Sequence, residues 1–407
     1  MGKINLGILP KLLLGILIGI LIGILIGSLG NLFNIGDASV FRLVIELAAT
    51  FKALFSTFLQ FLIPLLIVSF VAVGLADLGQ KANKLFLITL LLAYCSTVLA
   101  GLLAYFFGYA VLPHWITPIA SMNTSGTEFS PLFSIALDPV FGVMTALILA
   151  FVLGIGLANI KGERLLGCLK DLQQIISLTL KKIIIPLIPF YIAAQFAQIA
   201  ASGELFSTIK MFVMLFVMIL VFQWVYLLVQ FGISSLLSRE NQFKKIKNVI
   251  PAYFTALGTQ SSAATIPVNL ECAYKNKITK DVADFCIPLC ATIHLAGDTV
   301  CLVLGTMGIL LASGIAPDFG LYLPFILMLG VTMVAAPGVP GGGVMAALGI
   351  IGSMLGFTES MQSLIISLHF SQDSFGTATN IMGDQAIAFV VDAADLRSAG
   401  KKTAAEE

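Results

Sequence analysis

Charged residues are scarce in this sequence, and their scarcity decides its class. Asp, Glu, Lys and Arg make up 11% of the 407 residues, whereas apolar residues make up 58%. A soluble domain usually carries about a quarter charged residues, because its surface faces water. The chain is therefore expected to lie in a lipid bilayer. Its net charge of +1 provides no basic surface for nucleic acid, so we expect no nucleic-acid partner.

Cysteine pairs and processing signals are missing as well. The six cysteines are scattered, mostly within apolar runs, and none forms a CxxC pair, which excludes the usual metal and disulfide frameworks. The first apolar run, 6–28, is too long for a signal peptide and has no small-x-small cleavage site. Glycine recurs at every fourth residue from Gly15 to Gly27, which favours close helix packing in lipid. This run is expected to remain as a membrane helix.

Long apolar segments recur along the chain, and each is long enough to cross the ~30 Å hydrocarbon core as a helix. They cover 6–28, 44–77, 84–111, 138–159, 177–201, 207–237, 281–313 and 360–391. The sequence thus predicts an all-α polytopic membrane protein with eight transmembrane helices and no separate soluble domain. With both termini in the cytoplasm, 19 of the 22 Lys and Arg residues fall on the cytoplasmic side, as the positive-inside rule requires.

Two further apolar segments, 249–273 and 318–356, are interrupted near their centres by small and polar residues. The first lies between two basic clusters, so both of its flanks belong on the cytoplasmic side. The second has no Lys or Arg on either flank and is expected to enter from outside. Each arm is only about half a membrane long at ~1.5 Å per residue. We therefore predict two re-entrant hairpins of opposite orientation, the signature of an inverted repeat.

Acidic residues occur inside the last apolar segment. Asp373, Thr377, Asn380 and Asp384 have the spacing i, i+4, i+7 and i+11, which places them within about 60° on one helix face. Two residues flank this stripe: His369 and Gly376. An acid at the bilayer centre costs at least ~2.5–3.5 kcal/mol, so an aligned polar face of this kind indicates a functional site.

The hairpin tips and a short polar patch are the other candidate positions. Helix N-termini at opposed tips would meet near the midplane, where amides bind a carboxylate and carbonyls bind a cation. These tips contain Ser261 and Ser262 in the first hairpin and the glycines from Gly341 to Gly343 in the second. His294 and Asp298 form the patch and are a possible titratable pair, since histidine titrates near physiological pH.

Four motifs, "TQSSAATIP", "ATIHLAGD", "VPGGGV" and "DSFGTATNIMGD", resemble the signature regions of the dicarboxylate/amino acid:cation symporter family. The resemblance covers nearly the whole chain, and its last ~150 residues are the most specific. It implies a homotrimer in which each protomer has a scaffold and a transport domain that slides like an elevator. Within the single domain 1–407, the six helices of residues 6–237 would form mainly the scaffold and also part of the transport domain. Residues 243–395 would form the transport core, and 396–407 a cytoplasmic tail.

The resemblance also implies roles for individual residues. Asp373 would bind the substrate's α-amino group. Asn380 and the tip that contains Ser261 and Ser262 would bind its α-carboxylate. Thr377 would lie against the substrate side chain. The tip from Val339 through Gly341 to Gly343 would be the gate. A co-transported Na⁺ would bind at the Asp384 carboxylate, the backbone of Asn380, the backbone carbonyl of His294, and Thr292. A carboxylate suits an ammonium group, and carboxylate with carbonyl oxygens suits a hard cation.

Two departures from the family pattern refine this expectation. Members that take acidic substrates carry an arginine where this chain has Gly376, and no arginine occurs between Arg239 and Arg397. A substrate's second carboxylate would then lack a partner in a low-dielectric site, which favours a small neutral amino acid. In "HLAGD", His294 and Ala296 replace an asparagine and an aspartate of the family, so one additional sodium site is expected to be lost.

These observations lead to a sodium-coupled symporter for serine or threonine in a bacterial inner membrane, and not to an enzyme. Four alternatives stay open: proton coupling through His294 and Asp298, a C4-dicarboxylate or acidic amino acid symporter, a passive anion channel, and a membrane hydrolase. The hydrolase requires a serine such as Ser261 in hydrogen-bond reach of a histidine, and no GxSxG motif frames the serines.

Overall fold

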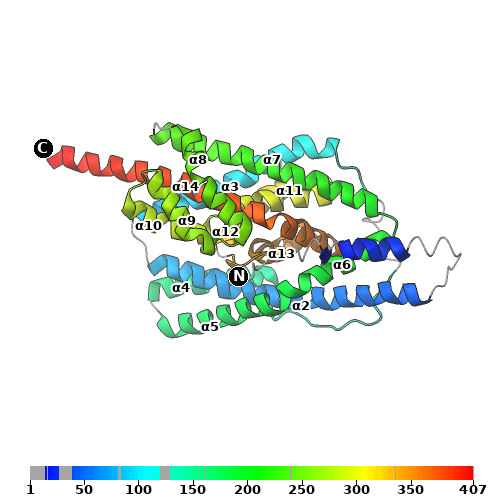
Figure 1. Cartoon of the computed structure of the whole chain (residues 1–407). Coiled ribbons are helices and arrows are strands. Elements are labelled where there is room, and N and C mark those ends of the chain that lie inside the picture. The colour runs from blue at the N-terminus through cyan, green and yellow to red at the C-terminus, as the bar shows by residue number, and fades with distance from the viewer. Residues whose placement is uncertain are drawn as a thin grey trace, which may run out of the picture.

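All regular secondary structure in the part of the chain that the computed structural model describes is helical (Figure 1). The described residues are 14–15, 17–26, 39–80, 84–119, 129–160, 162–238, 241–334 and 336–406. Their regular elements are α2 (Ser39–Gln80), α3 (Lys84–Val111), η1 (Leu112–His114), α4 (Val143–Ile160), α5 (Glu163–Thr179), η3 (Leu180–Ile184), α6 (Ile185–Ala201), α7 (Leu205–Ser238), α8 (Gln242–Thr259), α9 (Ser262–Lys275), α10 (Lys280–Ile293), α11 (Ala296–Ala312), α12 (Phe319–Val334), α13 (Gly342–Leu355) and α14 (Glu359–Glu406). The all-helical fold class is confirmed. Of the first predicted span, 6–28, residues 14–15 and 17–26 are helical, and the remaining residues, Gly27 among them, lie outside the described part of the chain.

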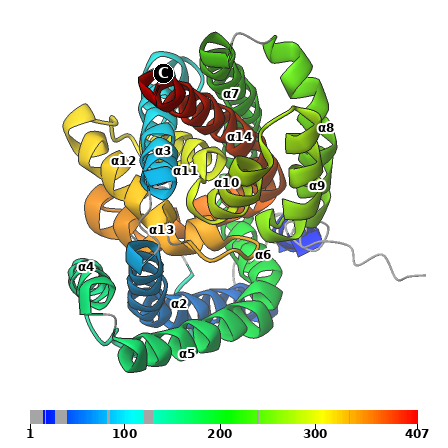
Figure 2. The same ribbon diagram turned by 90° about the vertical axis from the view of Figure 1, so that its left-hand side faces the viewer.

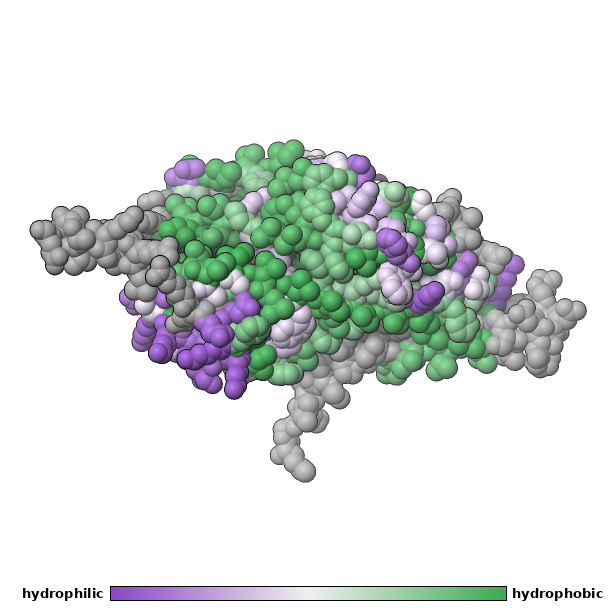
Figure 3. Space-filling model, turned by 90° about the horizontal axis from the view of Figure 1, so that it is seen from above, coloured by the Kyte–Doolittle hydropathy of each residue, from purple (hydrophilic) through white to green (hydrophobic). Residues whose placement is uncertain are grey.

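The surface supports the assignment to a membrane. Within the described residues, six helical stretches are long and apolar enough to cross a bilayer by length and composition. Large apolar side chains face outward, including Leu236 at 83% and Phe206 at 81% exposure. Figure 3 shows hydrophobic residues over the middle of one face, with hydrophilic residues gathered toward its two ends. Because such a surface is unfavourable in water, the molecule is a multi-pass membrane protein.

Most predicted spans match a helix, and two differ in an informative way. The predicted span 177–201 begins earlier, because α5, η3 and α6 follow one another without a gap from Glu163. α5 buries Leu166, Leu169 and Ile176 on one face and carries polar residues on the other, so a search for apolar runs misses it. The second difference concerns 281–313, which was expected to be one span.

That span is two helices. α10 ends at Ile293 and α11 begins at Ala296, because His294 and Leu295 leave the helical conformation (φ/ψ −118°/96° and −118°/54°). The apolar pattern does not reveal this break, since apolar residues continue on both sides of it. The break lies where α11 approaches α14 so closely that a Cβ on Gly297 would collide with the carbonyl oxygen of Gly376.

Two helix–turn–helix units occupy the positions predicted for hairpins. α8 and α9 pack against each other and are joined at Gln260, whose left-handed backbone (φ 53°) makes the turn. α12 and α13 likewise pack together, and their connection includes Gly341. That each unit enters and leaves the membrane on one side stays a prediction.

The helices form two groups (Figure 2). α2, α4 and α5 lie together on one side, and α3, α7, α8, α9, α10, α11 and α14 lie together on the other, with α13 between them. α11 is at the centre of the larger group, since 16 of its 17 residues are buried against α14, α3 and α7. A helix that is apolar around nearly its whole circumference belongs in such a position.

Candidate functional site

Four chain segments converge on one small cavity. These are the α8–α9 turn, the α10–α11 break, the α12–α13 turn and the middle of α14. The cavity is lined by Gln260, Ser261, Ser262, Ala291, Thr292, Leu295, Asp298, Ala336, Pro337, Gly338, Val339, Gly342, Gly343, Asp373, Thr377 and Asn380. Its volume of about 60 Å³ suits only a few water molecules or one small solute, at roughly 10–15 Å³ for each water.

The N-terminus of α9 forms one wall of this cavity. Ser261 is the N-cap residue, and its Oγ accepts a hydrogen bond from the Ala264 N–H at 3.3 Å. The Gln260 amide donates to the Ser374 hydroxyl at 2.7 Å, which ties this tip to α14. A helix N-terminus presents free N–H groups and a positive dipole end, so this wall suits an anionic group such as a carboxylate.

Asp373 on α14 connects to the opposite tip. Its side chain is buried, and its Oδ2 accepts a hydrogen bond from the Gly341 N–H at 3.0 Å. Gly341 has φ +73°, and a Cβ there would collide with the ring of Phe370, so this turn requires glycine. The carboxylate of Asp373 is therefore coupled directly to the position of the α12–α13 turn.

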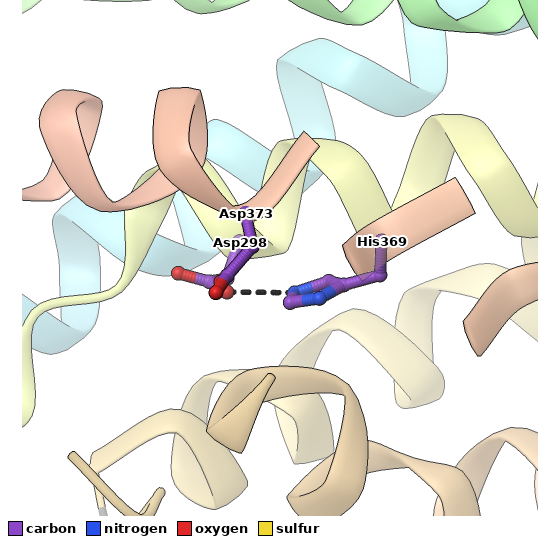
Figure 4. A group of neighbouring side chains, drawn as sticks. All are labelled: Asp298, His369 and Asp373. Atoms are coloured by element: carbon purple, nitrogen blue, oxygen red, sulfur yellow. Dashed lines mark hydrogen bonds and ion pairs between the residues drawn. The ribbon is translucent and has the colours of Figure 1, made fainter. Parts of the chain in front are cut away.

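A second carboxylate lies beside Asp373 (Figure 4). Asp298, in the first turn of α11, is buried. Its Oδ1 lies 2.7 Å from Nε2 of His369, and its Oδ2 accepts a hydrogen bond from the Asn380 amide at 2.6 Å. One ligand atom from each of Asp298, His369 and Asp373 lies within 4.8 Å of the other two. The alternative pairing of Asp298 with His294 is not formed, because Asp298 contacts His369 and His294 contacts Asp384.

His294 instead contacts Asp384. Its Nδ1 lies 3.0 Å from Oδ1 of Asp384, and its Nε2 lies 3.0 Å from the Ser96 hydroxyl on α3. Both side chains of this pair are fully buried, and Oδ2 of Asp384 has no hydrogen-bond partner among the described residues. A buried carboxylate oxygen without a donor is an acceptor open to a cation. Sequence reasoning missed Ser96, because a single serine in an apolar run carries no periodic signal.

The structure brings some of the expected site residues together and separates others. Of those assigned to substrate, Ser261, Ser262, Val339, Asp373, Thr377 and Asn380 line the cavity. Gly341 contacts Asp373 instead. Gly376 packs against the α10–α11 break, where a Cβ on this residue would meet no atom closer than 3.6 Å.

The side chains of the four residues expected at the sodium site have different neighbours. His294 and Asp384 are in contact, but the Asn380 side chain turns toward α11, where its Oδ1 accepts from the Gly297 N–H at 2.7 Å. The Thr292 side chain is exposed, and its hydroxyl donates to the Leu289 carbonyl at 2.7 Å. The ligands expected from Asn380 and His294 are backbone oxygens, so these side-chain positions do not decide the sodium site, which stays a prediction.

The geometry does not support a hydrolase. The Ser261 hydroxyl caps α9, whereas both histidines of the core are bonded to aspartates. A nucleophilic serine needs a histidine in hydrogen-bond reach, and the described bonds of Ser261 include none. The site is a small polar cavity enclosed by interrupted helices, which is the arrangement found at the binding sites of secondary transporters.

These features define a membrane transport protein and not an enzyme. The chain belongs to the sodium:dicarboxylate symporter family, whose model matches residues 8–394. Members of that family are elevator-type transporters.

Curated relatives match over shorter segments. Excitatory amino acid transporter 1 of Ambystoma tigrinum is 28% identical over 206 residues, which are 50% of this chain and 37% of that protein. Neutral amino acid transporter B(0) of Rattus norvegicus is 29% identical over 153 residues, 37% of this chain and 27% of its own length. Excitatory amino acid transporter 2 of Homo sapiens is 30% identical over 153 residues, which are 37% of this chain and 26% of that protein. The matched segments thus span about a third of these relatives.

Proposed function

We propose that this protein is a symporter that couples uptake of a small neutral amino acid, serine or threonine, to sodium influx. The observation that carries the proposal is the charge of the cavity. Asp298 and Asp373 both line it, and none of its described lining residues is Lys or Arg. An α-amino acid satisfies such a site, since its ammonium pairs with Asp373 and its carboxylate faces the N-terminus of α9.

The same charge distribution disfavours the acidic alternative. A dicarboxylate or acidic amino acid would place a further carboxylate beside Asp298 without a cationic partner, and an unpaired buried charge is strongly unfavourable. The position that carries arginine in acidic-substrate members is Gly376 here, on the same helix as Asp373. The small volume of the cavity agrees with a small substrate.

Asp384 is the proposed centre of the sodium site. Sodium is a hard cation that prefers oxygen ligands, and Oδ2 of Asp384 is a buried oxygen with no donor among the described residues. The backbone of Asn380, the backbone carbonyl of His294, and Thr292 are the other groups expected at the ion. The proton-coupled alternative is retained as an outcome of the test below.

The assembly is also proposed. The protein would be a homotrimer in a bacterial inner membrane with cytoplasmic termini. Residues 6–237 would supply mainly the scaffold and 243–395 the moving transport core. The packing of α2, α4 and α5 as a group apart from α11 and α14 supports this division. α3 and α7 pack against α11 and α14 and would be the part of 6–237 that belongs to the transport domain.

The test is uptake of labelled serine into liposomes that contain the purified protein, driven separately by a sodium gradient and by a pH gradient. We expect sodium-driven uptake that unlabelled serine or threonine blocks and aspartate or succinate does not. Uptake driven only by the pH gradient would show that the coupling ion is a proton and not sodium. Block by succinate or aspartate would overturn the substrate class.

A further inference from the structure

We propose that Asp298 is the residue that selects a hydroxyl group on the β-carbon of the substrate, and that His369 and Asn380 hold its carboxylate for this purpose. This inference rests on the proposed function and deepens it. It concerns the cluster in Figure 4, in which the carboxylates of Asp298 and Asp373 lie side by side with His369.

The spacing of the two carboxylates fits a β-hydroxy amino acid. An oxygen of Asp298 and an oxygen of Asp373 lie within 4.8 Å of each other. In serine or threonine the ammonium nitrogen and the hydroxyl oxygen are on adjacent carbons, about 3 Å apart in a gauche rotamer. With the ammonium on Asp373, the hydroxyl then reaches the neighbouring carboxylate without leaving a staggered conformation.

Asp298 has the hydrogen-bonding capacity for this role. A carboxylate offers about four acceptor positions and no donor. The described bonds, from the His369 ring and the Asn380 amide, use one position on each oxygen. The other acceptor positions are not used by these two bonds, and Asp298 itself lines the cavity. A hydroxyl donates into such a position, whereas the methyl group of alanine leaves it unfilled.

The surroundings hold the carboxylate in one place. Asp298 sits against the tip of α13, where a Cβ on Gly343 would collide with its Oδ1, and its own backbone is in the first turn of α11. The side chain of His369 is fully buried, so its ring has little freedom to turn away. His369 is therefore a positioning residue, because it acts through Asp298 and does not line the cavity.

The experiment compares substrates that differ by one hydroxyl group. Competition against labelled serine uptake in proteoliposomes gives apparent affinities for serine and alanine, and for threonine and 2-aminobutyrate. In the unmodified protein we expect the hydroxylated member of each pair to bind about 10- to 100-fold more tightly, as for a hydrogen bond to a charged group. In the variants Asp298→Asn and Asp298→Ala, the ratio of affinities between the hydroxylated and the non-hydroxylated amino acid should fall to between about one and three.

His369 variants separate positioning from folding. His369→Gln retains a side-chain N–H donor and should keep most of the serine-to-alanine ratio, whereas His369→Leu should lose it. The matched control is Asp392→Asn. Asp392 is a buried aspartate on α14 that bonds Thr279 and does not line the cavity. That control should leave the ratio unchanged.

Three results would overturn the inference while leaving the proposed function intact. The first is uptake by the unmodified protein with equal affinity for serine and alanine. The second is an unchanged ratio in the Asp298 variants, or in His369→Leu if the Asp298 variants do not fold. The third is a parallel loss of affinity for all four amino acids, which would assign Asp298 to the ammonium group. Failure of the unmodified protein to bind any of the four would instead refute the proposed function itself.

Discussion

At the residue scale, three buried aspartates are distinguished by their partners. Asp373 accepts from a backbone N–H of the α12–α13 turn, and Asp298 is held by an imidazole and an amide. Asp384 contacts His294 through one oxygen, and its other oxygen has no donor among the described residues. Because an unpaired buried charge is strongly unfavourable, the oxygen of Asp384 without a donor is the one that the proposed sodium ion would satisfy.

Asp373→Asn should remove serine binding with little effect on sodium. The substitution keeps the shape of the side chain but removes the charge that pairs with the ammonium. A hydrogen bond to a charged group contributes about 1.5–3 kcal/mol, so the dissociation constant for serine should rise at least tenfold. Isothermal titration calorimetry with serine at saturating sodium measures this dissociation constant, and Asp392→Asn is the control. Normal affinity for serine in the variant would show that the ammonium binds elsewhere.

Asp384→Asn should weaken sodium coupling before it weakens serine binding. Loss of a charged oxygen ligand should raise the sodium concentration that gives half-maximal serine uptake by about tenfold or more. Uptake measured over a series of sodium concentrations at saturating serine checks this expectation. If the sodium dependence stays as in the unmodified protein, the ion site is not at Asp384.

At the element scale, the decisive features are the interruptions of helices. The α10–α11 break, the α8–α9 turn and the α12–α13 turn bring backbone groups to the cavity, where α14 supplies side chains. Interrupted helices are tolerated at membrane depth only where protein buries them or where they line a cavity. The break at His294 also brings Gly297 against α14, so that the backbone N–H of Gly297 reaches Asn380.

Gly297→Ala tests this close approach. A Cβ there would meet the Gly376 carbonyl oxygen and the Thr379 side chain, and backbone atoms cannot move aside easily. Overpacking of this kind typically costs about 1–3 kcal/mol. The thermal midpoint of the purified protein should fall by several degrees, while Gly156→Ala on α4, which has open space around it, should leave it unchanged. Equal midpoints for the two variants would show that α11 and α14 can separate without penalty.

At the scale of the whole molecule, the fold consists of two groups of helices with α13 between them. An elevator mechanism requires the group that holds the cavity to slide past α2, and the interface of α13 with α2 is where this sliding is expected. At that interface a Cβ on Gly349 would lie 2.9 Å from the Ile63 side chain.

A reversible cross-link at this interface should stop transport but not binding. With the native cysteines replaced, the pair Ile63→Cys and Gly349→Cys should form a disulfide on oxidation. A Cβ on Gly349 would lie 2.9 Å from Cγ2 of Ile63, which is one bond from the Ile63 Cβ, and this puts the two Cβ atoms within about 4.5 Å. Serine uptake should then fall to background and recover on reduction, whereas serine affinity should stay within about twofold. Either cysteine alone is the control. Undiminished uptake by the cross-linked protein would contradict relative movement of α2 and α13.

The sequence by itself determined the membrane class, most helix bounds, the two helix–turn–helix units and the polar face of α14. These follow from local properties, namely hydropathy, helical periodicity and turn residues, which are written in consecutive positions. Only the tertiary structure decided that Asp298 pairs with His369, that His294 pairs with Asp384 through a broken helix, and that Ser96 joins that pair. The partners of a buried carboxylate come from helices distant in the sequence, and their choice depends on how closely those helices pack.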